Sequence, residues 1–319
     1  MKKLIPIFLI IASACARPGH DNGSGEPQAL APIYEYFAEY GPASALPDSL
    51  RPEVEAFMKV TGRGDASAPV LAAWAASPAV EVFTPVVDSV FPSLAPVEQG
   101  LGDVLARAVR EGLDLPRRRY AAVVWGRPES IVFCDSVMLV ALNHYLGASY
   151  PGYSHLPAYA RAAKEPSRLL SDMAEALVGT ACPYERREGS TVLSRLLYEG
   201  AMAEARMRLC GIGEAEALGY DDDTYADLAA HEGELWQLLV ARGLLYSTLS
   251  ADAERLVSPA PSVPLLGAAV PGRAGRFIGL RIVQTYLRRH PEATLPELLS
   301  PAFYDSDETL RRAAYTGGI

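Results

Sequence analysis

Residues 191–210 read TVLSRLLYEGAMAEARMRLC. Apolar and small side chains recur in this run at spacings of three and four residues, which predicts an amphipathic α-helix with a buried face. The residues at these positions are Leu193, Leu196, Leu197, Gly200, Ala203 and Met207. A buried helix of this kind is enough to explain the segment without any functional site.

The centre of this run, Tyr198-Glu199-Gly200-Ala201-Met202, has the spacing of the zinc-peptidase motif His-Glu-x-x-His. In that motif two histidines, four residues apart on one helix face, hold the metal, and the glutamate polarises the metal-bound water. Only Glu199 matches, since neither Tyr198 nor Met202 is a usual zinc ligand. A catalytic zinc site needs three protein ligands and an open position. We therefore expect no catalytic residue, no metal and no other cofactor at this place.

The chain begins with the pattern of a bacterial export signal. Two lysines are followed by a mostly apolar run, Leu4 to Ala14, which is shorter than the ~20 residues that span a bilayer. Residues 1–14 are thus predicted to be a signal peptide. Ala12-Ser13-Ala14-Cys15 resembles a lipobox, in which the cysteine receives acyl chains such as palmitate, although leucine is usual where Ala12 stands. Cleavage by ordinary signal peptidase after Ala14 or Ala16 is the alternative.

Residues 15–30 are rich in Gly, Pro and small polar side chains, which predicts a flexible tether, and residues 31–319 are predicted to form a single domain. Without Lys2 and Lys3, 27 of the 29 basic residues remain against 38 acidic ones, so the net charge changes from −9 to −11. Nucleic acid is excluded as a partner on these grounds, because it requires a basic patch. The expected location is the cell envelope, facing the periplasm, with the membrane contacted through lipid on Cys15.

Three cysteines remain after Cys15, namely Cys134, Cys182 and Cys210. In an oxidising compartment they allow one disulfide and one free thiol, and their spacing does not specify the pair. Three unpaired thiols are the alternative.

The rest of the chain predicts a mainly α fold of the α+β type with a small β-sheet. Strands are expected at 120–125 and 131–133, and residues 135–142 either extend the second strand or form a third. Helices are expected around the central run, at residues 52–62, 68–77, 79–92, 97–112, 167–178, 224–242 and 271–287. Gly275 and Gly279, four residues apart on the last of these helices, are expected to let another backbone approach closely.

Four segments in this order resemble the gliding-motility lipoprotein B family (GldB): DSVMLVALNHYLGASYPGY, LLYEGAM, ELWQLLVARGLLYST and PGRAGRFIGLRIVQTYLRR. The similarity extends from about Leu71 to Leu299. That family is in turn similar to zincin-type zinc proteases whose His-Glu-x-x-His motif it has generally lost. The resemblance implies a degenerate zincin-like fold and a relict cleft, with possible binding residues Tyr198, Glu199, Met202, His231, Glu232, Arg273 and Arg276.

Three functions are compatible with these features. The first is a non-enzymatic binding or assembly protein of a motility or secretion apparatus, whose cleft holds a peptide or a protein partner of the envelope. The second is a metal-dependent peptidase or hydrolase with atypical ligands, drawn from Glu199, Glu204, His231, Glu232 and Glu234. The third is a scaffold that uses only its outer surfaces. A bulky residue in place of Gly200 would separate the first from the third, if it abolished partner capture and left folding intact.

Overall fold

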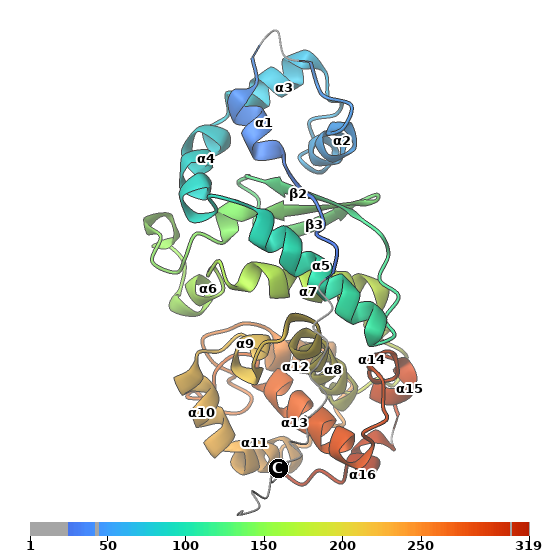
Figure 1. Cartoon of the computed structure of the whole chain (residues 1–319). Coiled ribbons are helices and arrows are strands. Elements are labelled where there is room, and N and C mark those ends of the chain that lie inside the picture. Colours follow the sequence, from blue (N-terminus) through green and yellow to red (C-terminus); the bar gives the residue numbers. More distant parts are fainter. Residues whose placement is uncertain (1–24, 42–44, 307, 319) are drawn as a thin grey trace, which may run out of the picture.

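The computed structural model of the chain describes residues 25–41, 45–306 and 308–318. These residues form a four-stranded sheet with helices on both faces and a helical half below it (Figure 1). The expected fold class, a mainly helical single domain with a small sheet, is confirmed. The predicted signal peptide, the lipidation site Cys15 and most of the tether lie outside the described residues.

The sheet has the strand order β1-β2-β4-β3, in which β1 and β4 run parallel to β2, and β3 runs antiparallel to β4. All of β4 and all of β2 after its first residue are buried, as expected for apolar strands that are covered on both faces. The predicted strands are confirmed, and residues 135–142 contribute a third. The bounds are β1 (Leu30–Pro32), β2 (Arg119–Val123), β3 (Ile131–Cys134) and β4 (Val137–Ala141).

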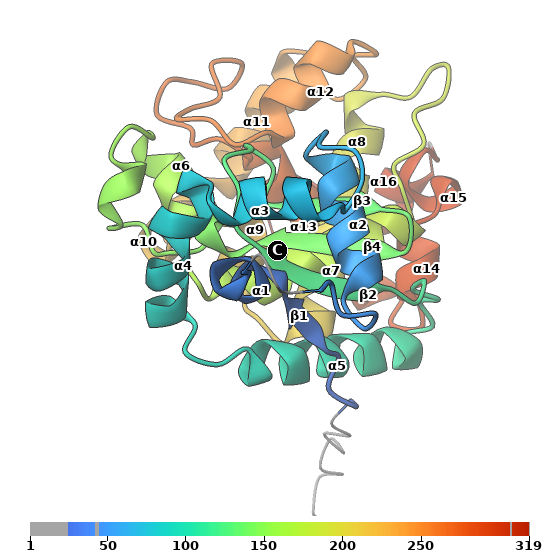
Figure 2. The ribbon, with the colours of Figure 1, turned by 90° about the horizontal axis from the view of Figure 1, so that it is seen from above.

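Helices α1 to α4 lie above the sheet, and α5 and α7 lie below it (Figure 1). From above, α1, α2 and α3 project onto the sheet, and α5 runs on the side of β1 (Figure 2). The bounds are α1 (Ile33–Glu39), α2 (Arg51–Val60), α3 (Ala68–Ala75), α4 (Pro78–Val90), α5 (Ala95–Arg110), α6 (Ala158–Ala162) and α7 (Arg168–Ala181), with 3₁₀ turns η1 (Leu142–His144) and η2 (Pro151–Tyr153).

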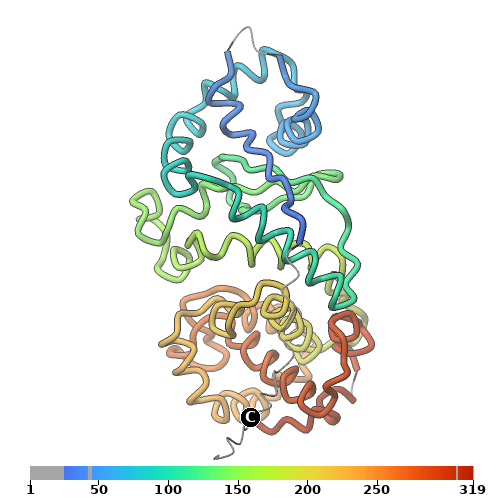
Figure 3. Tube along the Cα trace, in the orientation of Figure 1, coloured from blue at the N-terminus to red at the C-terminus, as the bar shows by residue number. Residues whose placement is uncertain are grey.

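The second half of the chain is helical, and in the backbone trace it stacks below the first half (Figure 3). Its bounds are α8 (Val192–Cys210), α9 (Glu214–Leu218), α10 (Asp222–Ala230), α11 (Glu232–Ala241), α12 (Ser250–Val257), α13 (Ala274–Arg289), α14 (Leu295–Leu298), α15 (Pro301–Tyr304) and α16 (Thr309–Ala313).

The interior consists of two apolar cores that share α5 and α7. One core surrounds the sheet and includes Met173 and Leu177 of α7. The other surrounds α8 and α13 and includes Ala174 and Val178 of the same helix. Because α7 contributes side chains to both cores, it lies between them.

The central run 191–210 forms the buried helix α8, as predicted. Thr191 caps its start by accepting a hydrogen bond from the Ser194 N–H, and Gly211 ends it in the left-handed conformation. Its most extensive contact is with α13, where the two helices cross at Gly200 and Gly279. A Cβ on Gly279 would lie 1.9 Å from the Leu196 carbonyl oxygen, so the close approach expected at this glycine is confirmed.

The same crossing means that a bulky residue at Gly200 cannot test for a ligand-binding cleft. A Cβ on Gly200 would lie 2.2 Å from the carbonyl carbon of Gly279. A larger residue at position 200 would therefore disrupt helix packing, and loss of partner capture in such a variant would carry no information about a cleft.

Two element boundaries differ from the sequence prediction. The tether was expected to reach residue 30, but residues 25–30 lie along α5, where the Gly25 N–H donates to Asp103 and the Leu30 N–H donates to Glu98. Glycine and proline suit this extended, closely packed strap as well as they suit a tether. The helix expected at 224–242 is broken at His231 into α10 and α11.

Two further properties concern the described residues. No single helix among them is long and apolar enough to cross a membrane; α3 and α4 meet the criterion only as a pair, bent by 60° at the break between them. Cys134, Cys182 and Cys210 are not joined in a disulfide there.

Candidate functional site

The two positions on α8 where a zinc peptidase carries histidines are filled by core side chains. The Tyr198 hydroxyl donates to the Cys182 carbonyl oxygen over 2.9 Å, and its ring packs against those of Tyr184 and Tyr304. Met202 is buried in the same core. Both side chains belong to the apolar core around α8 and α13.

Glu199 is buried and forms ion pairs with two arginines. Its Oε1 lies 2.9 Å from Arg195 Nε, one turn earlier on α8, and its Oε2 lies 2.7 Å from Arg276 Nε on α13. Both carboxylate oxygens are thus occupied by cations. The residue that matches the peptidase motif serves here to join two helices.

Glu199 is one member of a chain of ion pairs, the α7–α8–α13 charge network. Arg276 also pairs with Glu175, which pairs with Arg206 over 2.7 Å. Arg206 is 1% exposed and also forms an ion pair with Asp172. The full network comprises the arginines Arg168, Arg195, Arg206 and Arg276 and the carboxylates Asp172, Glu175, Glu199 and Glu254.

The network fixes the charge of its members. Burial opposes ionisation of Glu175, but Arg276 and Arg206 outweigh it and lower its pKa to about 2. Burial likewise disfavours the Arg276 cation, and the attraction of Glu175 and Glu199 raises its pKa above the ordinary value. Both groups remain charged at neutral pH.

The structure does not bring the other predicted cleft residues together with Glu199. Glu232 pairs with Arg281 over 2.9 Å and accepts a hydrogen bond from the Tyr315 hydroxyl over 2.8 Å. His231 is exposed at the break between α10 and α11, where a hydrogen bond to the Asp227 carbonyl oxygen raises its pKa.

The carboxylates of the alternative metal site are likewise apart. Glu204 pairs with Arg208 over 2.7 Å, and Glu234 is exposed. Within the described ranges, no three His, Cys, Asp or Glu side chains are placed to share a metal ion.

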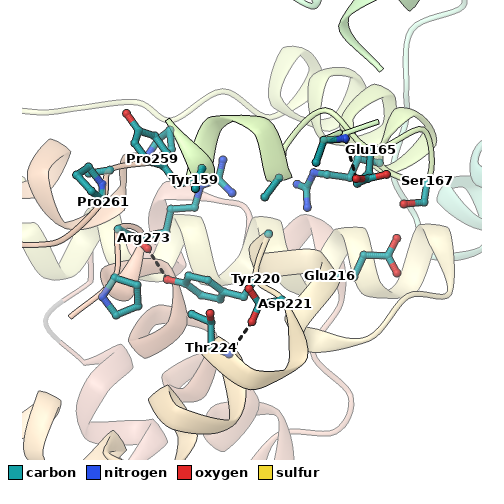
Figure 4. A pocket seen from close by; sticks show the side chains of 18 residues that line it. Tyr159, Glu165, Ser167, Glu216, Tyr220, Asp221, Thr224, Pro259, Pro261 and Arg273 are labelled. Carbon is teal, nitrogen blue, oxygen red and sulfur yellow. Dashed lines mark hydrogen bonds between the residues drawn. The ribbon is translucent and has the colours of Figure 1, made fainter. Parts of the chain in front are cut away.

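Arg273 lies in a different place, a pocket of about 650 Å³ between the two halves of the chain. Figure 4 shows Arg273 near Tyr159, Pro259 and Pro261, with Glu165, Ser167 and Glu216 toward the opposite end. The lining includes Tyr159, Glu165, Ser167, Arg168, Glu216, Gly219, Tyr220, Asp221, Thr224, Pro259, Pro261 and Arg273.

The backbone and charge of Arg273 are both unusual. Its φ is +67°, in the left-handed region that a side chain disfavours, at the start of α13. Burial and the neighbouring cations Arg276 and Arg168 lower its pKa to about 10. In the described part of the chain its Nε has no hydrogen-bond partner, and no carboxylate pairs with it.

Sequence reasoning selected Arg273 but not the rest of this pocket. Arg168, Tyr159 and Gly219 come from segments up to about a hundred residues away, which no spacing rule connects. The only sequence features near the pocket were the proline-rich loop 258–264 and the acidic run 221–223, which both border it. Neither feature by itself predicts a binding site.

The comparisons with known proteins agree with the sequence motifs. The family model described as gliding motility protein GldB matches residues 33–317, which is nearly all of the folded chain. No curated protein and no solved structure matches it. The chain therefore belongs to the family of the gliding motility protein GldB.

Proposed function

We propose that this chain is a lipid-anchored, periplasm-facing protein that acts without catalysis, as a binding or assembly component of a motility or secretion apparatus. Membership of the GldB family supports the link to motility and to the cell envelope. The lipobox-like residues up to Cys15 support the lipid anchor.

The single observation that carries the non-enzymatic part is the environment of Glu199. A metal-site glutamate must face a bound water next to an open coordination position. Here both of its oxygens face arginines at 2.9 and 2.7 Å, and Tyr198 and Met202 point into the core. On this proposal the peptidase-like helix of a zincin ancestor has been converted into a structural element.

The metal-dependent hydrolase is tested by the metal content of the protein. The soluble form starting at Ala16 is dialysed against trace zinc and manganese and measured by elemental mass spectrometry. We expect well below one metal ion per chain. About one ion per chain, lost in Glu199→Ala or His231→Ala, would make the chain an enzyme with a remodelled site.

The binding role is tested by photo-crosslinking in the native envelope. A photoreactive amino acid replaces Tyr159, which is 39% exposed at the rim of the pocket, and in a matched control it replaces Tyr246, which is 66% exposed elsewhere. We expect a discrete crosslinked product from position 159 and none from position 246. Equal products from both, or none from either, would contradict binding at this face.

The anchor is tested separately. The Cys15→Ser variant should lose acylation, detected by labelling with a palmitate analogue, and should leave the membrane fraction. Retention of the label in this variant would refute attachment through Cys15.

A further inference from the structure

The pocket at Arg273 lies where three helices begin. The pocket is lined by the first residue of α7, Arg168, and by the N-cap residues of α10 and α13, Asp221 and Arg273. The start of a helix carries a partial positive charge. Two guanidinium groups add full positive charges at the same place.

These guanidinium groups converge over Gly219. A Cβ on Gly219 would lie 2.1 Å from Arg273 Nη1 and 3.3 Å from Arg168 Nη2. The glycine has a φ of +81° and ends α9, so both its backbone and its missing side chain make room for the two arginines. Two cations thus lie close together, and among the described residues no carboxylate forms an ion pair with Arg273.

The charge network pairs Arg168 with a carboxylate but leaves Arg273 without one among the described residues. Within that network four arginines face four carboxylates, and Arg168 uses Asp172 at 3.5 Å. Arg168 Nε is buried without a hydrogen-bond partner in the described part of the chain, as is Arg273 Nε. Arg273 is therefore one cation in excess, held in a disfavoured backbone conformation. Strained, uncompensated charges of this kind are found mainly where they bind a ligand.

The acidic side chains that also line the pocket limit the charge of the anion that can bind there. Glu165, Glu216 and Asp221 also line the pocket, and they would repel a doubly charged phosphate. Glu165 accepts a hydrogen bond from the Ala148 N–H and Asp221 accepts one from the Thr224 N–H, so both carboxylates are held by neutral donors and keep their charge. A singly charged, planar carboxylate matches the arginine fork and meets less repulsion.

The pocket continues into a groove of about 490 Å³ that shares Ala260 and Pro261 with it. An extended chain can therefore leave the pocket past the proline-rich loop, beside Arg273 (Figure 4). Tyrosine and proline side chains along this route provide apolar contact for such a chain.

We propose that this pocket binds a carboxylate group between Arg168 and Arg273, above Gly219. The carboxylate belongs either to a small organic acid or to the C-terminus of a polypeptide that lies in the adjoining groove. This inference holds for a catalytic or a non-catalytic protein and so does not depend on the function proposed above.

The test is isothermal titration calorimetry on the mature chain with four probes: N-acetyl-alanyl-alanine, its carboxamide, acetate and inorganic phosphate. The carboxamide has the same shape without the charge. We expect the free carboxylate to bind at least about tenfold more tightly than the carboxamide, since the two charge-assisted hydrogen bonds are lost with the charge. If acetate binds as tightly as the dipeptide, the source is a small acid; tighter binding of the dipeptide indicates a polypeptide terminus.

Two variants with the same change of charge locate the site. Arg273→Gln should weaken binding of the free carboxylate by about tenfold or more, and Arg289→Gln, at an exposed arginine on the same helix, should leave it unchanged. The Arg273→Gly variant shows whether loss of binding is caused by misfolding. Glycine relieves the left-handed φ and removes the unpaired charge, so this variant should unfold at the same or a higher temperature while losing binding. A lower unfolding temperature would show that Arg273 has a structural role.

Glycine variants test the geometry without removing a charge. Gly219→Ala pushes Arg273 away, whereas Gly211→Ala has a comparable φ of +70° but meets only Arg107 Nη1, at an ordinary 3.5 Å. Both should lose similar stability, and only Gly219→Ala should weaken binding. The proposal is overturned if the carboxylate and carboxamide bind equally or not at all, if inorganic phosphate binds more tightly than the carboxylate, or if both arginine variants behave alike.

Discussion

The crossing of α8 and α13 makes a quantitative prediction for Gly279→Ala. The new Cβ would lie 1.9 Å from the Leu196 carbonyl oxygen, and ordinary contact begins near 3.4 Å, so the helices must separate by about 1.5 Å. The obstacle is backbone and cannot rotate away. Overpacking of a core usually costs about 1–3 kcal/mol and occasionally more, and a backbone obstacle places this case at about 4 kcal/mol. Alanine recovers about 1 kcal/mol of helix propensity. The net loss in unfolding free energy is thus about 3 kcal/mol.

The measurement is equilibrium unfolding in urea, followed by far-UV circular dichroism, on a series graded by steric overlap. Gly275→Ala meets the Leu256 Cβ and carbonyl oxygen, both at 2.9 Å, a shortfall of about 0.5 Å, and should lose about 1–2 kcal/mol, less than Gly279→Ala because the overlap is smaller. Gly126→Ala, with no atom within 4 Å and no positive φ, should stay within about 0.5 kcal/mol of the parent. If Gly279→Ala unfolds at the same urea concentration as Gly126→Ala, the two helices do not cross at their glycines.

Three further predictions concern the charge network and the cap of α8. Arg276→Met leaves the Glu199 and Glu175 carboxylates without their shared cation and should lower the unfolding free energy by about 3–5 kcal/mol, while Arg289→Met should have little effect in the same urea titration. Because the pKa of Glu175 is lowered to about 2 in the folded state from an ordinary 4.5, its stabilisation is complete above about pH 4.5 and is lost as the pH falls toward 2. Thermal unfolding across this range should show that loss, and Glu175→Gln should flatten it; a parent profile that is already flat would contradict the pairing. Thr191→Ala removes the cap of α8 and should cost about 1 kcal/mol, whereas an unchanged urea midpoint would show that the cap is not needed.

The sequence was sufficient for the elements with a strong period. The buried strands, α8 and the glycine-bearing α13 were predicted because apolar side chains and glycines at fixed spacing leave few other arrangements. The short β1 and the helices of four or five residues near the C-terminus were not, because three to five residues do not establish a period. His231 fits the interior of a helix, but the chain turns there, and Glu232 at the start of α11 pairs with Arg281.

The candidate site was predictable only in part, because the sequence does not show which charged side chains pair with one another. The motif around Glu199 drew attention to α8, and Arg276, predicted with it only as a possible binding residue of a relict cleft, pairs with it in the structure. Which arginine compensates which carboxylate depends on α7, and no pattern in residues 167–181 predicts that Asp172 and Glu175 pair with arginines of other helices. The excess cation at Arg273 cannot be predicted from the sequence, because it depends on which ion pairs the described residues form in the folded chain.

The position of α7 in both cores has a consequence for how this chain can be divided. A fragment that ends after α7 would expose Ala174 and Val178 to water, and one that begins at α8 would leave Arg206 without Glu175. The loop at residues 182–191 is therefore a poor place to cut, although it separates the sheet from the helical half. Truncated versions for crystallisation should keep both halves, and recombination at this loop would not yield a transferable module.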